Sequence, residues 1–183
     1  LLKSRHLFSG VDHFALFDLY AGEGHVDENV FAYSNRGKSG HERSLVVYNN
    51  AFDGANGWLK DSSSINVGTE DEPNLVRRTL SEALGLRADG HVWYGLYELR
   101  SDQWYLRNAA QLASEGLFVA LNGYEAQVFM AFRELDDPAG EWAAFAAHLN
   151  GAGVADLDGD FGTFVESKRE REFVQNRGPR PYP

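Results

Sequence analysis

Short runs of alternating apolar and polar residues occupy much of the first two-thirds of the chain. Residues 30–35 read VFAYSN and residues 44–48 read SLVVY, and both runs are rich in β-branched and aromatic side chains. Alternation with a period of two is the pattern of a β-strand. The charged, glycine-containing segment 36–43 (RGKSGHER) separates the two runs. The pattern therefore predicts an antiparallel hairpin with a long, charged tip.

The same reasoning predicts further strands. Segment 51–74 is rich in Gly, Asn, Asp and Ser, so we interpret it as a loop that holds at most one short strand. Asn122 and Gly123 lie between two apolar runs, which is a strong signal for a tight hairpin. The remaining strands are predicted at 13–20, 64–67, 91–100, 103–107, 117–121 and 125–135.

Helical spacing appears in the middle of the chain and again near its end. Residues 74–85 (NLVRRTLSEALG) predict a helix with Asn74 as N-cap and Gly85 as its end, and residues 108–116 predict a second, shorter one. After residue 136 the pattern becomes helical throughout. Asp137 and Pro138 stand where the N-cap and first position of a helix are expected, and a further helix is predicted over 161–173.

These elements predict a mainly β fold, an antiparallel β-sandwich with peripheral short helices and a helical C-terminal appendage. We assign residues 12–135 to the sandwich and 136–175 to the appendage. Residues 1–11 are interpreted as a linker from an upstream domain, and the basic, proline-rich residues 176–183 as a tail.

Composition narrows the function classes. The chain has 183 residues, 43% of them hydrophobic, which is enough for a core. Its formal charge of −10 disfavours nucleic acid as a partner, and no apolar run is long enough to span a membrane. The absence of cysteine excludes disulfides, zinc–thiolate sites and cysteine nucleophiles. The chain does not begin with Met, so we expect a piece of a longer protein, and nothing in it demands export, so a cytoplasmic location is expected.

Motifs that could carry chemistry are weak. RGKSG at 36–40 resembles part of a phosphate loop, but it joins strand to strand, and a phosphate loop joins strand to helix. DLDGD at 156–160 has the alternating acids of a calcium loop, but it lacks that loop's glycine and final glutamate, so a solvated helix start is favoured. The histidines show no metal-ligand spacing and no G-x-S-x-G motif occurs. We therefore predict no catalytic residue, no metal site and no cofactor.

Aromatic residues are the remaining candidates for a site. Flat rings suit the C–H faces of sugars, but they suit a protein core as well. We expect most of the rings to pack the sandwich. The candidates for carbohydrate contact are Trp58, Trp93, Tyr94 and Trp104, with Trp58 favoured because it is predicted to lie in a loop.

The stretch DENVFAYSNRGKSGHERSLVVYNNAF resembles the start of the C-terminal β-domain of α-amylase-like enzymes, glycoside hydrolase family 13. Those domains carry a strand like VFAYSR, a turn and a strand like LVVVNF. The later stretch GLFVALNGYEAQVFMAF is similar to their closing pair of strands, and the resemblance covers about residues 12–135. The helix-bearing middle insertion and the helices after residue 136 depart from the usual domain.

The resemblance implies an accessory role. Catalytic Asp and Glu residues in that family lie in an (α/β)₈ barrel upstream, and no motif of that barrel occurs here, so no catalytic residue carries over. The implied function is a non-catalytic domain that packs against the barrel of the same polypeptide, in a parent that is a glycoside hydrolase or glucanotransferase of α-glucan metabolism. Three alternatives stay open: a carbohydrate-binding module that uses exposed aromatics on α-glucan, an enzyme with an unrecognised site, and a purely structural interaction domain.

Overall fold

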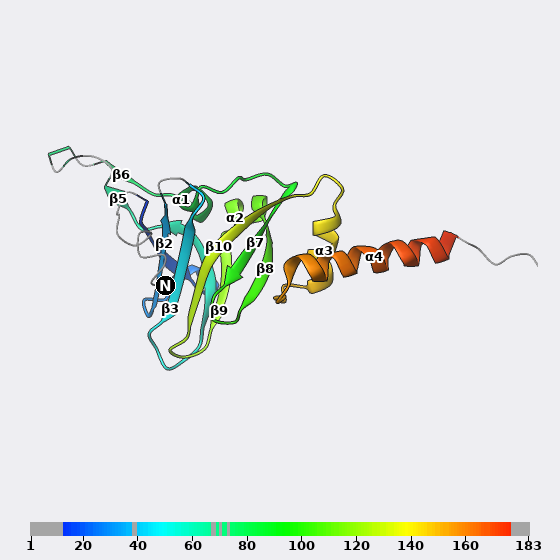
Figure 1. The fold of residues 1–183 in the computed structure, drawn as a ribbon. Coiled ribbons are helices and arrows are strands. Elements are labelled where there is room, and N and C mark those ends of the chain that lie inside the picture. The colour runs from blue at the N-terminus through cyan, green and yellow to red at the C-terminus, as the bar shows by residue number, and fades with distance from the viewer. Residues whose placement is uncertain (1–12, 38–39, 67–68, 70, 73, 177–183) are drawn as a thin grey trace, which may run out of the picture.

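The computed structural model describes residues 13–37, 40–66, 69, 71–72 and 74–176, and Figure 1 shows its fold. The predicted linker 1–11 and residues 177–183 of the predicted tail lie outside the described residues. The fold is mainly antiparallel β with several helices, as predicted. Eight strands form one sheet in the order β8-β7-β10-β3-β2-β1-β4-β9. They are β1 (Ala15–Tyr20), β2 (Val30–Arg36), β3 (Arg43–Asn49), β4 (Ala55–Ser62), β7 (Val92–Glu98), β8 (Gln103–Asn108), β9 (Leu117–Leu121) and β10 (Ala126–Asp136).

The other elements are short, apart from the last helix. Strands β5 (Ile65–Asn66) and β6 (Leu75–Val76) pair only with each other. The helices are η2 (Gly22–Gly24), α1 (Leu80–Leu84), α2 (Ala109–Ser114), α3 (Glu141–Leu149) and α4 (Leu157–Asn176).

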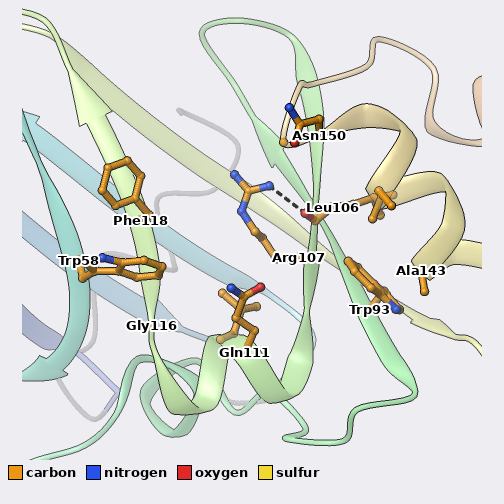
Figure 2. Close-up of a pocket in the computed structure, with 13 residues that line it drawn as sticks. Trp58, Trp93, Leu106, Arg107, Gln111, Gly116, Phe118, Ala143 and Asn150 are labelled. Carbon is orange, nitrogen blue, oxygen red and sulfur yellow. Dashed lines mark hydrogen bonds between the residues drawn. The ribbon is translucent and has the colours of Figure 1, made fainter.

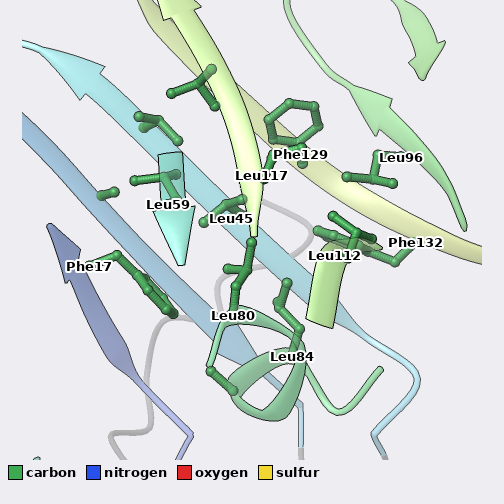
Figure 3. Close-up of a cluster of buried hydrophobic side chains, with 14 of the residues drawn as sticks. Phe17, Leu45, Leu59, Leu80, Leu84, Leu96, Leu112, Leu117, Phe129 and Phe132 are labelled. Carbon is green, nitrogen blue, oxygen red and sulfur yellow. The ribbon is translucent and has the colours of Figure 1, made fainter. Parts of the chain in front are cut away.

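The sheet curls around a single core. Its strands point one face inward, Tyr105 of β8 packs against the same cluster, and α1 and α2 add Leu80, Leu84 and Leu112 to it (Figure 3). This burial explains the alternating pattern of the sequence, because each strand has one face in the core. All eight strands are hydrogen-bonded into this one sheet, so the predicted sandwich of two separate sheets is not confirmed.

The hairpin predicted from residues 30–48 is confirmed. Strands β2 and β3 pair from Val30 opposite Asn49 to Arg36 opposite Arg43. The tip that contains RGKSG therefore joins strand to strand, as the sequence indicated, although residues 38–39 lie outside the described part.

The hairpin predicted around Asn122 and Gly123 is wrong. Strand β9 pairs with β4, and strand β10 pairs with β3 and β7, so the chain crosses the curled sheet between β9 and β10. The β3–β4 connection crosses beside it. Gly123 packs so tightly on this connection that a Cβ there would overlap the Phe52 carbonyl oxygen. Contact between two loops far apart in sequence thus overrides the local turn signal.

Asn49 joins the two crossing connections. Its side chain is fully buried, and its Nδ2 donates to the carbonyl oxygens of Asp53 (2.7 Å) and Asn122 (3.0 Å). Its Oδ1 accepts from the Ala51 N–H at 3.0 Å. One side chain therefore satisfies three backbone groups that no strand partner reaches.

Two further boundaries differ from the predictions. Segment 51–74 was expected to be a loop, but β4 occupies 55–62, with Ala55, Gly57 and Leu59 facing the core. The helix expected from Asn74 begins at Leu80, because Thr79 and Glu82 form a reciprocal capping box there. Its predicted end at Gly85 is confirmed by a left-handed backbone at that residue.

The helices after residue 136 pack on the outer side of the sheet around a second cluster. Leu106, Leu135, Phe145 and Leu157 are its buried members, and the Trp142 and Phe161 rings stack at 3.6 Å. A Cβ at Gly95 would lie 2.8 Å from Leu157 Cδ2. The absence of a side chain at this position therefore allows the start of α4 to pack closely against the sheet.

The starts of both C-terminal helices follow from acidic side chains. The predicted N-cap, Asp137, is wrong, because α3 begins at Glu141 rather than at Pro138 and Gly140 is its N-cap. The Asp137 carboxylate nevertheless accepts from the N–H groups of Trp142 (3.0 Å) and Ala143 (2.9 Å) in the first turn. DLDGD leads into α4, where Asp156 accepts from the Gly159 N–H at 3.1 Å. Helix α4 is longer than predicted and extends beyond the body of the molecule (Figure 1).

Candidate ligand-binding site

Three aromatic rings follow one another across neighbouring strands on the outer face of the sheet. Tyr20 of β1 stands opposite Trp58 of β4, and Trp58 stands opposite Phe118 of β9. Side chains directly opposite each other project from the same face. Trp58 and Phe118 are 36% and 46% exposed, and their rings meet edge to face at 5.3 Å. We call Tyr20, Trp58 and Phe118 the aromatic row.

A cleft of about 490 Å³ begins at the end of this row. It lies at the seam of the curled sheet, between the two edge strands β8 and β9, with α2 at one end and α3 along one side (Figure 2). The sheet does not close here, since β8 and β9 make no ladder with each other. The lining residues are Trp58, Trp93, Leu106, Arg107, Gln111, Leu112, Gly116, Phe118, Ala143, Ala146, Ala147, Asn150 and Gly151.

Arg107 is the charged group of the cleft. Its side chain lies between Phe118 on one wall and Leu106 on the other (Figure 2). Its Nη1 donates to the Leu106 carbonyl oxygen at 2.8 Å, and the guanidinium carbon lies 5.8 Å from the centre of the Tyr105 ring. Burial lowers the pKa of the Arg107 guanidinium, because a partly desolvated site disfavours the charge.

The walls of the cleft differ in chemistry. Trp93 and the alanines of α3 form an apolar side, and the Trp58–Phe118 pair forms an aromatic side. Gln111 lies below Arg107 in Figure 2, and its Nε2 donates to Glu115 Oε2 at 2.9 Å. A volume of this size, with mostly apolar walls and a few polar groups, is typical of small-molecule sites.

A second recess of about 410 Å³ lies on the other side of Trp58. Its lining comes from β1, β4 and the end of α2: Tyr20, Trp58, Lys60, Asp61, Ser114 and Glu115. Trp58 thus borders both hollows, and the aromatic row continues from one to the other.

The structure brings together two of the four aromatic candidates. Trp58 and Trp93 line opposite walls of the cleft. Trp104 instead packs in the second cluster, with its ring 5.2 Å from that of Tyr97.

Tyr94 lies in the core and is fully buried. Its hydroxyl donates to Glu134 Oε2 at 2.8 Å and accepts from the Arg87 N–H at 2.9 Å. Burial, together with the nearby Glu134 carboxylate, raises the pKa of Tyr94 to about 12. Its ring thus belongs to the interior and presents no face to the cleft.

Sequence reasoning missed Arg107, Gln111 and Phe118. A signal for Arg107 was present in the run QWYLRN, where strand alternation places Arg107 on the same face as Tyr105 and on the opposite face from Leu106. A charge on the inward face of a strand is rare and points to a special environment. Nothing in the sequence alone places Phe118 or Gln111 beside it.

Comparisons with protein-family models, with curated proteins and with solved structures each found no match. Within the described ranges, no three His, Asp or Glu side chains come together in a way that could hold a metal ion. No helix in the part of the chain that the structure describes is long and apolar enough to cross a bilayer.

Proposed function

We propose that this chain is a non-catalytic C-terminal accessory domain of an α-amylase-like glycosidase. It packs against the (α/β)₈ catalytic barrel upstream in the same polypeptide and stabilises it, in a parent glycoside hydrolase or glucanotransferase that acts on α-glucans. The proposal retains a sandwich-like arrangement, in which opposite halves of the curled sheet pack through the shared core. The observation that carries it is an apolar surface on the outside of β1, β2, β3 and β10.

This surface, which we call the outer apolar face, is built by register. Leu16, Tyr33, Val46 and Val128 stand opposite one another in a row across four strands, and Phe31 stands opposite Tyr48 in the next row. The ring of Phe14 lies 5.9 Å from that of Tyr33 and extends the first row.

Several of these side chains are exposed. Leu16 is 49% exposed, Phe31 55% and Phe14 36%. A contiguous exposed apolar patch is typical of a contact surface. Complete burial of one such side chain contributes about 1.5–3 kcal/mol, so a few of them suffice to hold two domains together. The amylase-like strand sequences favour a barrel as the partner.

The first test is the gene upstream of Leu1. The proposal requires a barrel with the family's Asp, Glu and Asp motifs in the same reading frame. An upstream sequence without such a barrel would refute it.

The second test uses the full polypeptide with Leu16→Glu and Phe31→Glu together. We expect a shorter half-life of glucan-degrading activity on heating, while urea unfolding of the isolated chain changes little, because both side chains point to solvent there. Phe52→Glu is the matched control, since Phe52 is 82% exposed but belongs to the β3–β4 connection. An unchanged half-life in the double variant would contradict the proposal.

The aromatic row favours a second candidate function, carbohydrate binding. Tyr20, Trp58 and Phe118 lie next to one another across adjacent strands, and partly exposed aromatic rings can stack on the apolar faces of sugars. Affinity electrophoresis of the isolated chain in gels that contain α-glucan tests it. Retardation that Trp58→Ala abolishes and Trp104→Phe preserves would support this function, and migration at the rate of a glucan-free gel would exclude it.

A further inference from the structure

Arg107 lies inside the cleft without an acidic partner, whereas two other arginines beside the sheet are paired with carboxylates. Arg87 contacts Glu134 at 2.8 Å and Asp136 at 3.1 Å, and Arg133 contacts Asp158 at 2.6 Å. For Arg107, no carboxylate of the described residues lies within salt-bridge distance, and its guanidinium donates instead to the carbonyl of the adjacent residue, Leu106.

The positive charge and several N–H donors of Arg107 therefore have no partner within the described part of the cleft. A guanidinium carries five N–H donors in a planar fork, and the Leu106 carbonyl takes up only one nitrogen. Partial burial of an unpaired cation is costly, and an anion in the cleft would remove that cost. A phosphate or carboxylate fits the fork with two parallel hydrogen bonds.

The surroundings of Arg107 restrict what could accompany the anion. Trp58 and Phe118 border one side of the guanidinium, and Trp93 with the small residues of α3 borders the other (Figure 2). These walls favour a flat, partly apolar ring next to the acidic group. The cleft volume of about 490 Å³ admits one or two rings and excludes a folded partner.

We propose that the seam cleft binds a small anionic sugar, in which a phosphate or carboxylate pairs with Arg107 and the sugar ring lies against Trp58 and Phe118. The sugar part rests on the second candidate function above, whereas the anion part does not. The chain's net charge of −10 gives no long-range attraction for an anion, so recognition depends on contact within the cleft.

Calorimetric titration of the chain tests the proposal with four probes: glucose 1-phosphate, glucuronate, glucose and inorganic phosphate. The first two separate a phosphate from a carboxylate as the anion, and the last two separate the ring from the charge. We expect at least one charged sugar to bind about tenfold more tightly than glucose and than inorganic phosphate, because only the charged sugar makes both the charge-assisted contact with Arg107 and the contact with the aromatic rings.

Variants assign the contacts. Arg107→Met keeps the apolar stem and is expected to weaken the charged sugar about tenfold or more, and Arg107→Lys, which keeps the charge without the fork, to weaken it several-fold. Arg100→Met is the control, because Arg100 is exposed and donates to the Ala126 carbonyl outside the cleft. Trp58→Ala should weaken the charged sugar without changing the affinity for inorganic phosphate.

Three results would overturn the proposal. One is the absence of binding of both charged sugars at millimolar concentration. Another is that wild type and the folded Arg107 variants bind the charged sugar with equal affinity. Near-ultraviolet circular dichroism shows whether each variant is folded, and if Arg107→Met does not fold, the comparison uses Arg107→Lys. The third is equal affinity for inorganic phosphate and the charged sugars, which would leave an anion site without a sugar. None of these results concerns the outer apolar face, so the accessory-domain proposal is tested independently of this one.

Discussion

Replacement of Asn49 by alanine should be among the most damaging polar substitutions in this protein. The side chain is fully buried and makes three hydrogen bonds, to Asp53, Asn122 and Ala51, which hold the β3–β4 and β9–β10 connections together. The alanine variant loses all three and leaves the Asp53 carbonyl and the Ala51 N–H without a partner, whereas the Asn122 carbonyl keeps the Glu125 N–H at 3.2 Å.

The magnitude follows from those bonds. Each contributes about 1 kcal/mol net, and an unsatisfied buried group costs about 1–3 kcal/mol, so Asn49→Ala should lose about 3–5 kcal/mol. Domains of this size have an unfolding free energy of about 5–15 kcal/mol, so the loss is a large share of the total. The assay is equilibrium urea unfolding followed by tryptophan fluorescence.

Two further variants separate the hydrogen bonds from other effects. Asn50→Ala changes an exposed neighbour and should cost less than about 0.5 kcal/mol. Asn49→Asp preserves volume but turns an acceptor toward two carbonyl oxygens, so it should lose at least as much as the alanine variant. A loss below about 1 kcal/mol for Asn49→Ala, or near wild-type stability for Asn49→Asp, would refute this reasoning.

Two other predictions concern the β7 strand. Burial by itself would raise the pKa of Glu98, but N–H groups of Val128, Ser101 and Arg100 donate to its carboxylate and hold the pKa below its usual value. A lowered pKa in the folded state means that the carboxylate stabilises the fold above its unfolded pKa, about 4.3, and that this stability is lost as the pH falls through the folded pKa. The stability gap between wild type and Glu98→Gln should therefore shrink in urea titrations below about pH 4, and a constant gap would be inconsistent with this. Gly95→Val should push Leu157 away from the sheet, at a cost of about 1–3 kcal/mol, and should speed hydrogen exchange in the first turns of α4. Gly90→Ala is the control and should change neither quantity, because a Cβ there meets nothing within 4 Å. Unchanged exchange in the Gly95→Val variant would argue against the contact between Gly95 and Leu157.

Local patterns in the sequence located most of the secondary structure. The β2–β3 hairpin, the β7–β8 pair and helix α2 follow from alternation, β-propensity and turn residues, because in each case the partner or cap lies within a few residues. Asp137 marked the approach to α3 for the same reason, although Gly140 rather than Asp137 is the N-cap.

The features that sequence reasoning missed depend on distant contacts. Asn122 and Gly123 gave a strong local signal for a hairpin, but the Asn49 side chain and the Phe52 loop direct the strands to different partners. Strand β4 was hidden by its glycine and asparagine content, because its inward face was recognisable only once the core was known.

The candidate site was predictable only in part. Trp58 and Trp93 were among the expected aromatic contacts, but Tyr94, on the opposite face of β7 from Trp93, packs into the core. Alternation indicates that Trp93 and Tyr94 point to opposite faces of the strand, but it does not indicate which of the two faces is exposed to solvent. The cleft itself arises where two sheet edges approach each other, which no local pattern encodes.

The strand order has a consequence for synthesis on the ribosome. The first four strands form the contiguous centre of the sheet, β3-β2-β1-β4, and β10 and β9 later attach to its two sides. A nascent chain that has reached only β4 therefore carries two open edges, each able to recruit a foreign strand. These edges are covered only after residues 117–136 have emerged, so this domain should depend on chaperones during that interval and gain protease resistance late in translation.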